Sequence, residues 1–99
     1  MSLNTAGPRP PRTYHIKEIS DTTATLSWTP PLTGQPDDYL ITLQNNNNER
    51  LTTYPALAYP ATEFVLWHLE NNTPYTAFLQ TRIDEERSTN MSMGFRTGL

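Results

Sequence analysis

The side chains that could do acid–base or metal chemistry are ten carboxylates and two histidines. His15 and His68 both fall in segments of strand character, and neither has a nucleophile motif beside it. The sequence contains no G-x-S-x-G, H-E-x-x-H or phosphate-binding loop, and it has no cysteine for a thiolate metal site or a disulfide. These residues predict a protein that is not an enzyme and needs no metal or cofactor.

Five of the ten carboxylates gather in two places along the chain. Two of them follow a proline-rich stretch, and three stand with an arginine in the segment DEERSTN. The clustered residues are Asp37, Asp38, Asp84, Glu85, Glu86 and Arg87. Neither cluster has the D-x-D-x-D-G spacing of a calcium loop. They are candidates for steering a basic protein partner, and the alternative is a solvated surface that only favours solubility.

Two large aromatic side chains are expected to face solvent. Strand alternation turns Trp67 outward in FVLWHL, and it turns Phe78 outward in YTAFLQTRI, near Leu40 of a neighbouring strand. Exposed aromatic residues are common at the centre of protein interfaces, although cross-strand pairing can also cover them locally. Trp67, Phe78 and Leu40 therefore form a second set of candidate contact residues.

Two N-x-[ST] acceptor sequences occur, at Asn71-Asn72-Thr73 and at Asn90-Met91-Ser92. Glycans on Asn71 or Asn90 would require a secreted protein. Asn71 falls in an expected turn, as an acceptor should, whereas Asn90 borders an expected strand.

Period-two alternation of apolar residues identifies the elements that position these side chains. Nine prolines and many threonines and asparagines disfavour helix, and short alternating runs separated by turn residues indicate strands. The positions expected to face inward are Ala24, Leu26, Trp28, Tyr39, Ile41, Leu43, Phe64, Leu66, Tyr75, Ala77, Leu79, Thr81, Met91, Met93 and Phe95. Seven short strands at a spacing of about eight to twelve residues predict an antiparallel β-sandwich.

The order of these pieces resembles the fibronectin type III family from about Pro8 to Thr97. The matching positions are Trp28 followed by Pro30 and Pro31, then Tyr39, Leu69, Tyr75, and Thr97 at the close of the last strand. The resemblance implies an all-β, seven-stranded antiparallel immunoglobulin-like sandwich over residues 8–98. Met1-Ser2-Leu3 is typical of a cloning scar, so residues 1–7 are expected to be scar and linker. An immunoglobulin domain proper is disfavoured because the cysteine pair is missing.

The resemblance also implies a role for the segment LENNTPYTAF. In such sandwiches the tyrosine after the turn fills one end of the core, and its hydroxyl bonds backbone of the preceding loop. Tyr75 would take that position, with Leu69 closing the same end of the core from the other side of the turn. Trp28 and Tyr39 would be further residues of the structural core. The family often has proline-glycine in this turn, and Asn71-Asn72 stand here instead, which left-handed asparagine backbone can accommodate.

In this architecture the loop after the second strand and the loop after the sixth emerge at the same end, so both acidic clusters would meet at one tip. We expect the tip to be the contact surface ahead of the Leu40/Phe78 face, because five carboxylates serve no need of the core. The tip contains no Arg-Gly-Asp.

Composition limits the partners further. The net charge of −3 and the absence of a basic stripe exclude a nucleic-acid binder, and no run approaches the ~20 apolar residues of a membrane span. The resemblance implies an interaction and spacer module from the extracellular region of a cell-surface receptor or adhesion protein. Its partners would be another protein and the neighbouring domains of its own chain. The alternatives are a spacer of a secreted microbial carbohydrate-degrading enzyme and an intracellular muscle-type scaffold module.

Overall fold

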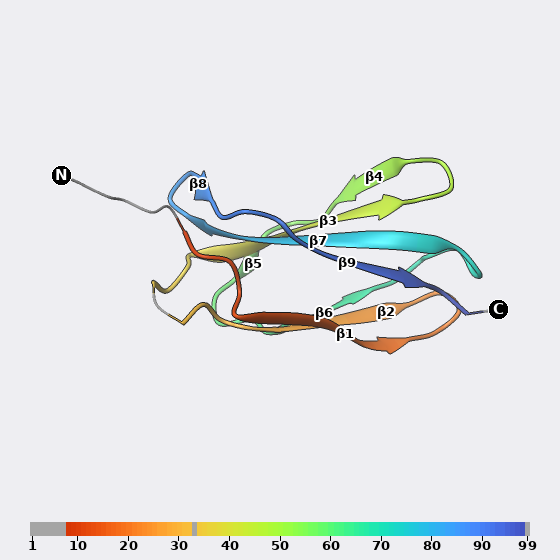
Figure 1. The fold of residues 1–99 in the computed structure, drawn as a ribbon, viewed down its shortest axis with the longest axis horizontal. Helices are drawn as coiled ribbons and strands as arrows, with labels where there is room; N and C mark the ends of the chain where they lie inside the picture. The colour runs from red at the N-terminus through yellow and green to blue at the C-terminus, as the bar shows by residue number, and fades with distance from the viewer. Residues whose placement is uncertain (1–7, 33, 99) are drawn as a thin grey trace.

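Two antiparallel β-sheets pack face to face in the computed structural model, which describes residues 8–32 and 34–98 (Figure 1). The smaller sheet has the order β1-β2-β6, and the larger has β4-β3-β7, with β5 beside β3 and both β8 and β9 beside β7. The strands are β1 (Thr13–Ile19), β2 (Ala24–Thr29), β3 (Asp38–Asn45), β4 (Arg50–Thr53), β5 (Leu57–Ala58), β6 (Glu63–Leu66), β7 (Pro74–Ile83), β8 (Glu86–Arg87) and β9 (Met91–Arg96). Seven of them have four or more residues, so the predicted seven-stranded sandwich is confirmed, and β5 and β8 are additional two-residue strands. The predicted scar and linker at residues 1–7 lie outside the described residues.

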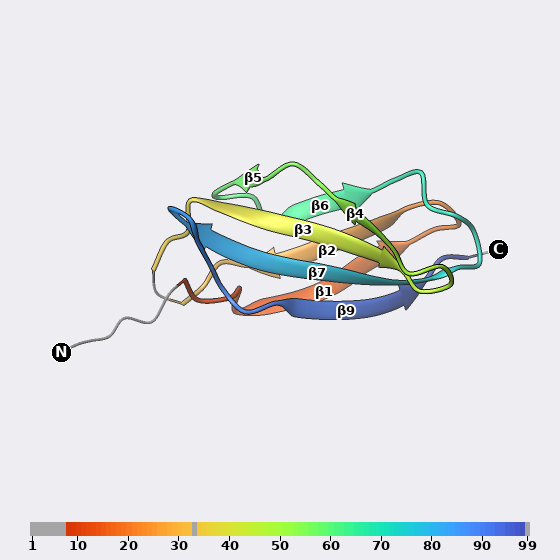
Figure 2. The same ribbon diagram turned by 90° about the horizontal axis from the view of Figure 1, so that it is seen from above.

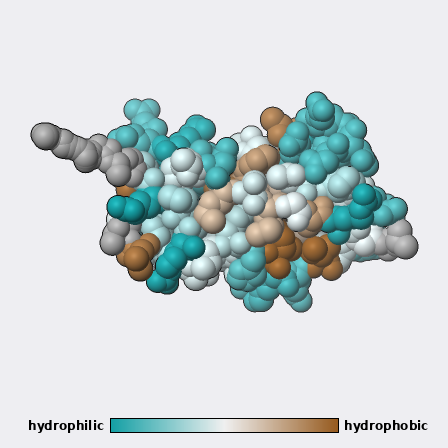
Figure 3. All heavy atoms as spheres, in the orientation of Figure 1, coloured by the Kyte–Doolittle hydropathy of each residue, from teal (hydrophilic) through white to brown (hydrophobic). Residues whose placement is uncertain are grey.

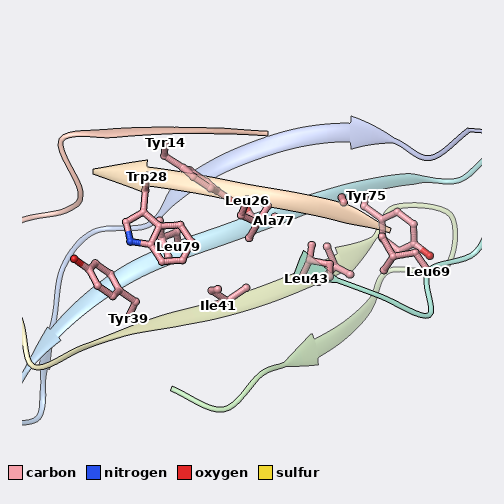
Figure 4. Packing of buried hydrophobic residues seen from close by; sticks show 12 residues of the cluster. Tyr14, Leu26, Trp28, Tyr39, Ile41, Leu43, Leu69, Tyr75, Ala77 and Leu79 are labelled. Carbon is pink, nitrogen blue, oxygen red and sulfur yellow. Dashed lines mark hydrogen bonds between the residues drawn. The ribbon is translucent and has the colours of Figure 1, made fainter. Parts of the chain in front are cut away.

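Alternation along β2 and β3 builds the core. Every second residue of each strand is buried, because the apolar residues recur at the two-residue period of a strand. Trp28 of β2 and Tyr39 of β3 meet across the sheets with their ring centroids 5.2 Å apart (Figure 4). The buried apolar residues are Tyr14, Ala24, Leu26, Trp28, Tyr39, Ile41, Leu43, Leu66, Leu69, Tyr75, Ala77 and Leu79.

Strand β7 is the centre of the larger sheet. Its ten residues pair with β3 on one side and with β9 on the other, and Ile41 stands opposite Leu79 while Ala77 stands opposite Met93. Because both edges of β7 are occupied along most of its length, its inward side chains are fully covered, and Ala77 and Leu79 have no exposed surface.

Two expectations are wrong in detail. Phe95, expected to be buried with the core, is only partly buried, because β9 lies at the edge of its sheet and covers the core from one side. Met91 and Met93 are partly buried for the same reason. His68, expected on a strand, follows the end of β6 and has a positive φ of 62°.

The connections divide between the two ends of the sandwich. The β2–β3 connection and the β7–β8 turn lie at one end, and the β3–β4 turn and the β6–β7 loop lie at the other (Figure 2). The described chain enters at the first end and finishes at the second. Within the described residues, no helix is long and apolar enough to cross a membrane.

Candidate functional site

The two acidic clusters meet at one end of the sandwich, as the sequence predicts. The backbone N–H of Asp84, in the β7–β8 turn, donates to Oδ2 of Asp37 at 2.8 Å. The backbone N–H of Asp37 in turn donates to the carbonyl of Arg82 at 2.8 Å. The carboxylate of Asp37 therefore holds the turn in place as well as facing solvent.

Asp38 is not a free charge of this tip. Its carboxylate receives two hydrogen bonds from the Arg82 guanidinium, from Nε at 2.9 Å and from Nη2 at 2.6 Å. The side chain of Asp38 is only 17% exposed, and the hydrogen bonding and charge of Asp38 raise the pKa of Arg82, so the pair remains ionised. The register makes this pair, because Asp38 and Arg82 are directly opposite on β3 and β7.

The remaining charges of the tip have mixed sign. Asp84, Glu85 and Glu86 are exposed, and Arg87 is also exposed and stands opposite Arg82 across β7 and β8. The tip keeps an excess of negative charge, but two arginines lie among its carboxylates. Its attraction for a basic partner is therefore weaker than five unpaired carboxylates would produce.

The outer face of the larger sheet has a shallow hollow of about 380 Å³. Phe78 lies in its floor, half-buried, and Leu51 of β4 stands at its wall with 61% of its surface exposed. Leu40 is half-buried, and it is diagonal to Phe78 because its direct partner on β7 is Gln80. The other lining residues are polar, and they are Thr42, Gln44, Gln80 and Asn90. Sequence reasoning found Phe78 and Leu40 and missed Leu51, whose strand is too short to show a clear alternation.

A second hollow, of about 410 Å³, lies beside Trp67 at the other end of the sandwich. Trp67 follows β6, is 52% exposed, and leans on Phe64 with ring centroids 5.8 Å apart. Phe64 in turn packs edge-on against Tyr54 at 5.3 Å. The charged and polar walls of the hollow come from Arg50, Glu70 and several neighbours, which are Asn45, Asn48, Thr52 and His68. The exposure of Trp67 agrees with its predicted outward position, but the hollow beside it was not predicted.

A hydrogen-bonded corner holds the segment that carries Trp67. The Tyr75 hydroxyl accepts from the backbone N–H of Glu70 at 2.7 Å, as the sequence predicts. The Thr97 hydroxyl donates to the backbone carbonyl of Glu70 at 2.6 Å, and Asn45 Nδ2 donates to Glu70 Oε1 at 2.9 Å. Glu70 is thus held by Tyr75 of β7, by Thr97 after β9 and by Asn45 of β3. Leu69 and Tyr75 close the same end of the core (Figure 4).

The turn within this corner has the expected backbone. Asn72 has a φ of 49°, which is the left-handed conformation that asparagine tolerates in place of glycine. Asn71 is exposed, and the Thr73 hydroxyl of its acceptor sequence donates to the Asn71 carbonyl at 2.8 Å. Asn90 is also exposed and lines the hollow at Phe78. A glycan on Asn90 would therefore cover that hollow.

No group of three or more His, Asp or Glu side chains in the described part of the chain is arranged to hold a metal ion. His15 and His68 are exposed and lie on different sheets or loops. The described residues thus offer two hollows and a charged tip as surfaces for contact with another molecule.

Comparisons with known proteins agree with this architecture. The sequence profile described as Fibronectin type III domain matches residues 9–93. A solved redesigned β-sandwich protein is 31% identical, with a TM-score of 0.80 over 91% of this chain and 95% of that one. A two-domain fibronectin type III segment of chicken tenascin is 22% identical (TM-score 0.81; 89% of this chain, 49% of that one), and titin domains A168–A170 are 19% identical (TM-score 0.77; 98% and 35%). No curated protein sequence matches the chain.

Proposed function

The chain belongs to the fibronectin type III family, and we propose that it is a non-enzymatic interaction and spacer module in the extracellular region of a cell-surface receptor or adhesion protein. The spacer role is supported by the placement of the described chain ends at opposite ends of the sandwich (Figure 1), so that neighbouring domains can follow one another along one line. The extracellular setting is supported by the exposed acceptor asparagine Asn71, in the turn before β7. Asn90 gives no such support, because a glycan there would cover the hollow at Phe78.

The contact surface in this proposal is the outer face of the larger sheet around Phe78 and Leu51. The observation that carries it is the exposed Leu51 side chain, which lines one hollow of about 380 Å³ together with the half-buried Phe78. Exposed apolar side chains on the sheet face contribute little free energy to folding, and burying them against a partner would stabilise the complex by removing their surface from water. The tip is the weaker candidate, because Asp38 is paired with Arg82 and Asp37 holds the Asp84 turn.

Binding kinetics on an array of purified secreted and receptor-ectodomain proteins test both the interaction role and the location of the contact surface. For a protein that binds the domain, Phe78→Ala should speed dissociation about tenfold or more and leave association nearly unchanged, since a desolvated aromatic anchor contributes about 2 kcal/mol. The matched charge variant replaces Asp84, Glu85 and Glu86 by amides, and it should slow association slightly and flatten its dependence on salt.

The reverse result, with the charge variant losing affinity and Phe78→Ala binding normally, would place the site at the tip. If no ectodomain binds at all, the interaction role fails and the spacer role alone remains.

An intracellular muscle-type scaffold module is the second candidate, because the titin domains cover almost the whole of this chain. The two candidates differ in the sequence that surrounds the domain in its parent protein. A membrane-spanning or signal segment supports the extracellular proposal, and a long array of tandem sandwiches without either supports the scaffold.

A further inference from the structure

One edge of the larger sheet, the outer edge of β9, has no strand paired with it within the described residues. Within the described residues β9 pairs only with β7, and in Figure 2 it is the outermost strand on its side of the molecule. Its pairing with β7 is regular from Arg96 opposite Pro74 to Met91 opposite Leu79, without a bulge. It contains no proline or lysine, the residues that commonly block an exposed edge.

The other edges are protected against strand pairing. β1 is interrupted by a register shift between Ile16 and Glu18, and the two charged residues Lys17 and Glu18 lie at that shift. β4 and β6 have only four residues each. Charged side chains, bulges and short length are the usual means of preventing edge-to-edge association. β9 is regular and six residues long, and its single charged residue, Arg96, stands at its end.

The backbone groups that face the open side of β9 can be assigned by residue parity. The N–H of Thr97 donates to Thr73 on the β7 side at 3.1 Å, so odd-numbered residues bond to β7. The N–H of Gly98 donates instead to the Ser20 carbonyl at 3.0 Å, on the opposite side. The N–H and C=O groups of Ser92, Gly94 and Arg96 therefore point out of the sheet edge.

We propose that β9 pairs with β9 of a second copy of this chain, antiparallel and centred on Gly94. In this register Gly94 stands opposite its own copy, and Ser92 stands opposite Arg96 at both ends. Each of these three pairs exchanges two backbone hydrogen bonds, and the two sheets become continuous. The register two residues further toward the end of the strand would place Arg96 against its own copy, so charge disfavours it.

The side chains along the same edge support a second copy as the occupant. Apolar side chains lie on both β9 and β1, and Figure 3 shows apolar patches, interrupted by polar surface, on this side of the sandwich. Ile19 is 47% exposed there, and Ile16, Met93 and Phe95 are only partly buried. In the proposed dimer Met93 stands beside Phe95 of the other copy on the inner face, an arrangement that suits a sulfur–aromatic contact.

Sedimentation equilibrium of the 99-residue chain tests the proposal. A single strand pair is a small interface, so we expect a monomer at about 10 µM and a dimer to predominate near 1 mM. Ser92→Glu should lower the dissociation constant and Ser92→Lys should raise it, because residue 92 faces Arg96 of the other copy. Two symmetry-related pairs should change the constant by roughly two- to thirtyfold.

Disulfide trapping tests the register independently, because the chain has no cysteine of its own. A side chain fits at Gly94, where a Cβ would meet only the Tyr75 carbonyl at 3.9 Å. Two Gly94→Cys residues would have Cα atoms about 5.5 Å apart, which suits a disulfide. Under mild oxidation Gly94→Cys should crosslink at least about tenfold faster than the control Thr53→Cys, on the exposed edge strand β4.

A wild-type chain that stays monomeric at 1 mM would overturn the proposal. Equal dimerisation of the Ser92→Glu and Ser92→Lys variants, or equal crosslinking at positions 94 and 53, would overturn it as well. Thermal melts of the same variants show whether they are folded. A variant that is folded but does not follow the expected order counts against the β9 pairing.

Discussion

Replacing Tyr75 by phenylalanine removes one hydrogen bond and keeps the buried ring. The Tyr75 side chain is 4% exposed, and its hydroxyl accepts the Glu70 N–H at 2.7 Å. Loss of such a bond costs about 0.5–1.5 kcal/mol, and a fully buried orphan partner would raise the cost toward about 3 kcal/mol. Glu70 is exposed, so water can reach its N–H after the change. We therefore expect the free energy of unfolding to fall by about 1 kcal/mol.

Thermal and urea unfolding measure this effect. For a domain of this size, about 1 kcal/mol lowers the midpoint temperature by roughly 4–8 °C. The urea m-value should be unchanged, because the variant buries the same surface. The change should appear in the midpoint alone.

Tyr39→Phe is the matched control. The Tyr39 hydroxyl is buried and faces the Trp28 indole nitrogen (Figure 4), whose hydrogen bonding opposes the rise that burial causes in the Tyr39 pKa. Within the described part of the chain, neither atom has a partner at good hydrogen-bond geometry, so no well-formed bond is lost in the control. Removing an unpaired buried hydroxyl should leave stability unchanged or raise it. A loss at Tyr39 as large as that at Tyr75 would show that the Tyr75 effect is not due to its bond to Glu70.

A double-mutant cycle tests the corner as a unit. Tyr75 and Thr97 hold the two sides of Glu70. Thr97→Val removes the hydroxyl that donates to the Glu70 carbonyl at 2.6 Å and accepts the buried Thr73 N–H at 2.9 Å, so its own loss includes both bonds. The loss of unfolding free energy in the double mutant should differ from the sum of the two single-mutant losses by about 0.5 kcal/mol or more, as for groups that share a partner. Full stability of Tyr75→Phe, or strictly additive losses, would refute the argument that Glu70 is the common anchor.

Three further predictions follow from the same structure. Burial raises the pKa of Tyr14 and Tyr39 above the ordinary 10.0, so on raising the pH the unfolded chain loses these protons before the folded chain does. The two tyrosines should therefore leave the free energy of unfolding unaffected below pH 10.0 and lower it as the pH rises above 10.0. Urea melts across that pH range measure the effect. Asn72→Ala should cost roughly 1 kcal/mol because of the positive φ, whereas Asn72→Gly should be neutral within about 0.5 kcal/mol in thermal melts. Mass spectrometry of the chain secreted from animal cells should find a glycan on Asn71 before Asn90, and an unmodified Asn71 would remove the acceptor sequences as support for secretion.

The fold was predictable because alternation and turn chemistry act locally. Trp28, Tyr39 and Leu79 are buried as their parity predicts, since shifting a strand by one residue would move all its apolar side chains into water. The position of Tyr75 was equally clear from its place after the turn. Phe95 was predicted less well, because parity reports which face a residue takes but does not report that β9 lies at an edge.

The corner was only half visible in the sequence. Asn45 and Thr97 continue the inward parity of their strands, yet both are polar, and a polar side chain at an inward position requires a hydrogen-bond partner. That signal could have identified both as members of a network. Their common partner, Glu70, could not be named, because it comes from a loop of another part of the chain.

The charges of the tip illustrate what only register decides. Asp38 and Arg82 are 44 residues apart in sequence, and they pair because β3 and β7 place them directly opposite one another. The sequence counts Asp38 among five carboxylates of one end, whereas in the structure Asp38 forms an ion pair with Arg82 of β7, which lies outside the DEERSTN segment. The same register leaves Phe78 on the open face with Leu51 nearby, since β4 brings that leucine alongside β3.

The two candidate surfaces make different kinetic predictions. Screened charges at a tip of mixed sign act mainly on the association rate, whereas a desolvated aromatic side chain acts on the lifetime of the complex. We therefore prefer the sheet face to the tip as the contact surface. The tip charge Asp38 is already paired with Arg82, whereas the apolar surface of Leu51 beside Phe78 is still exposed to water.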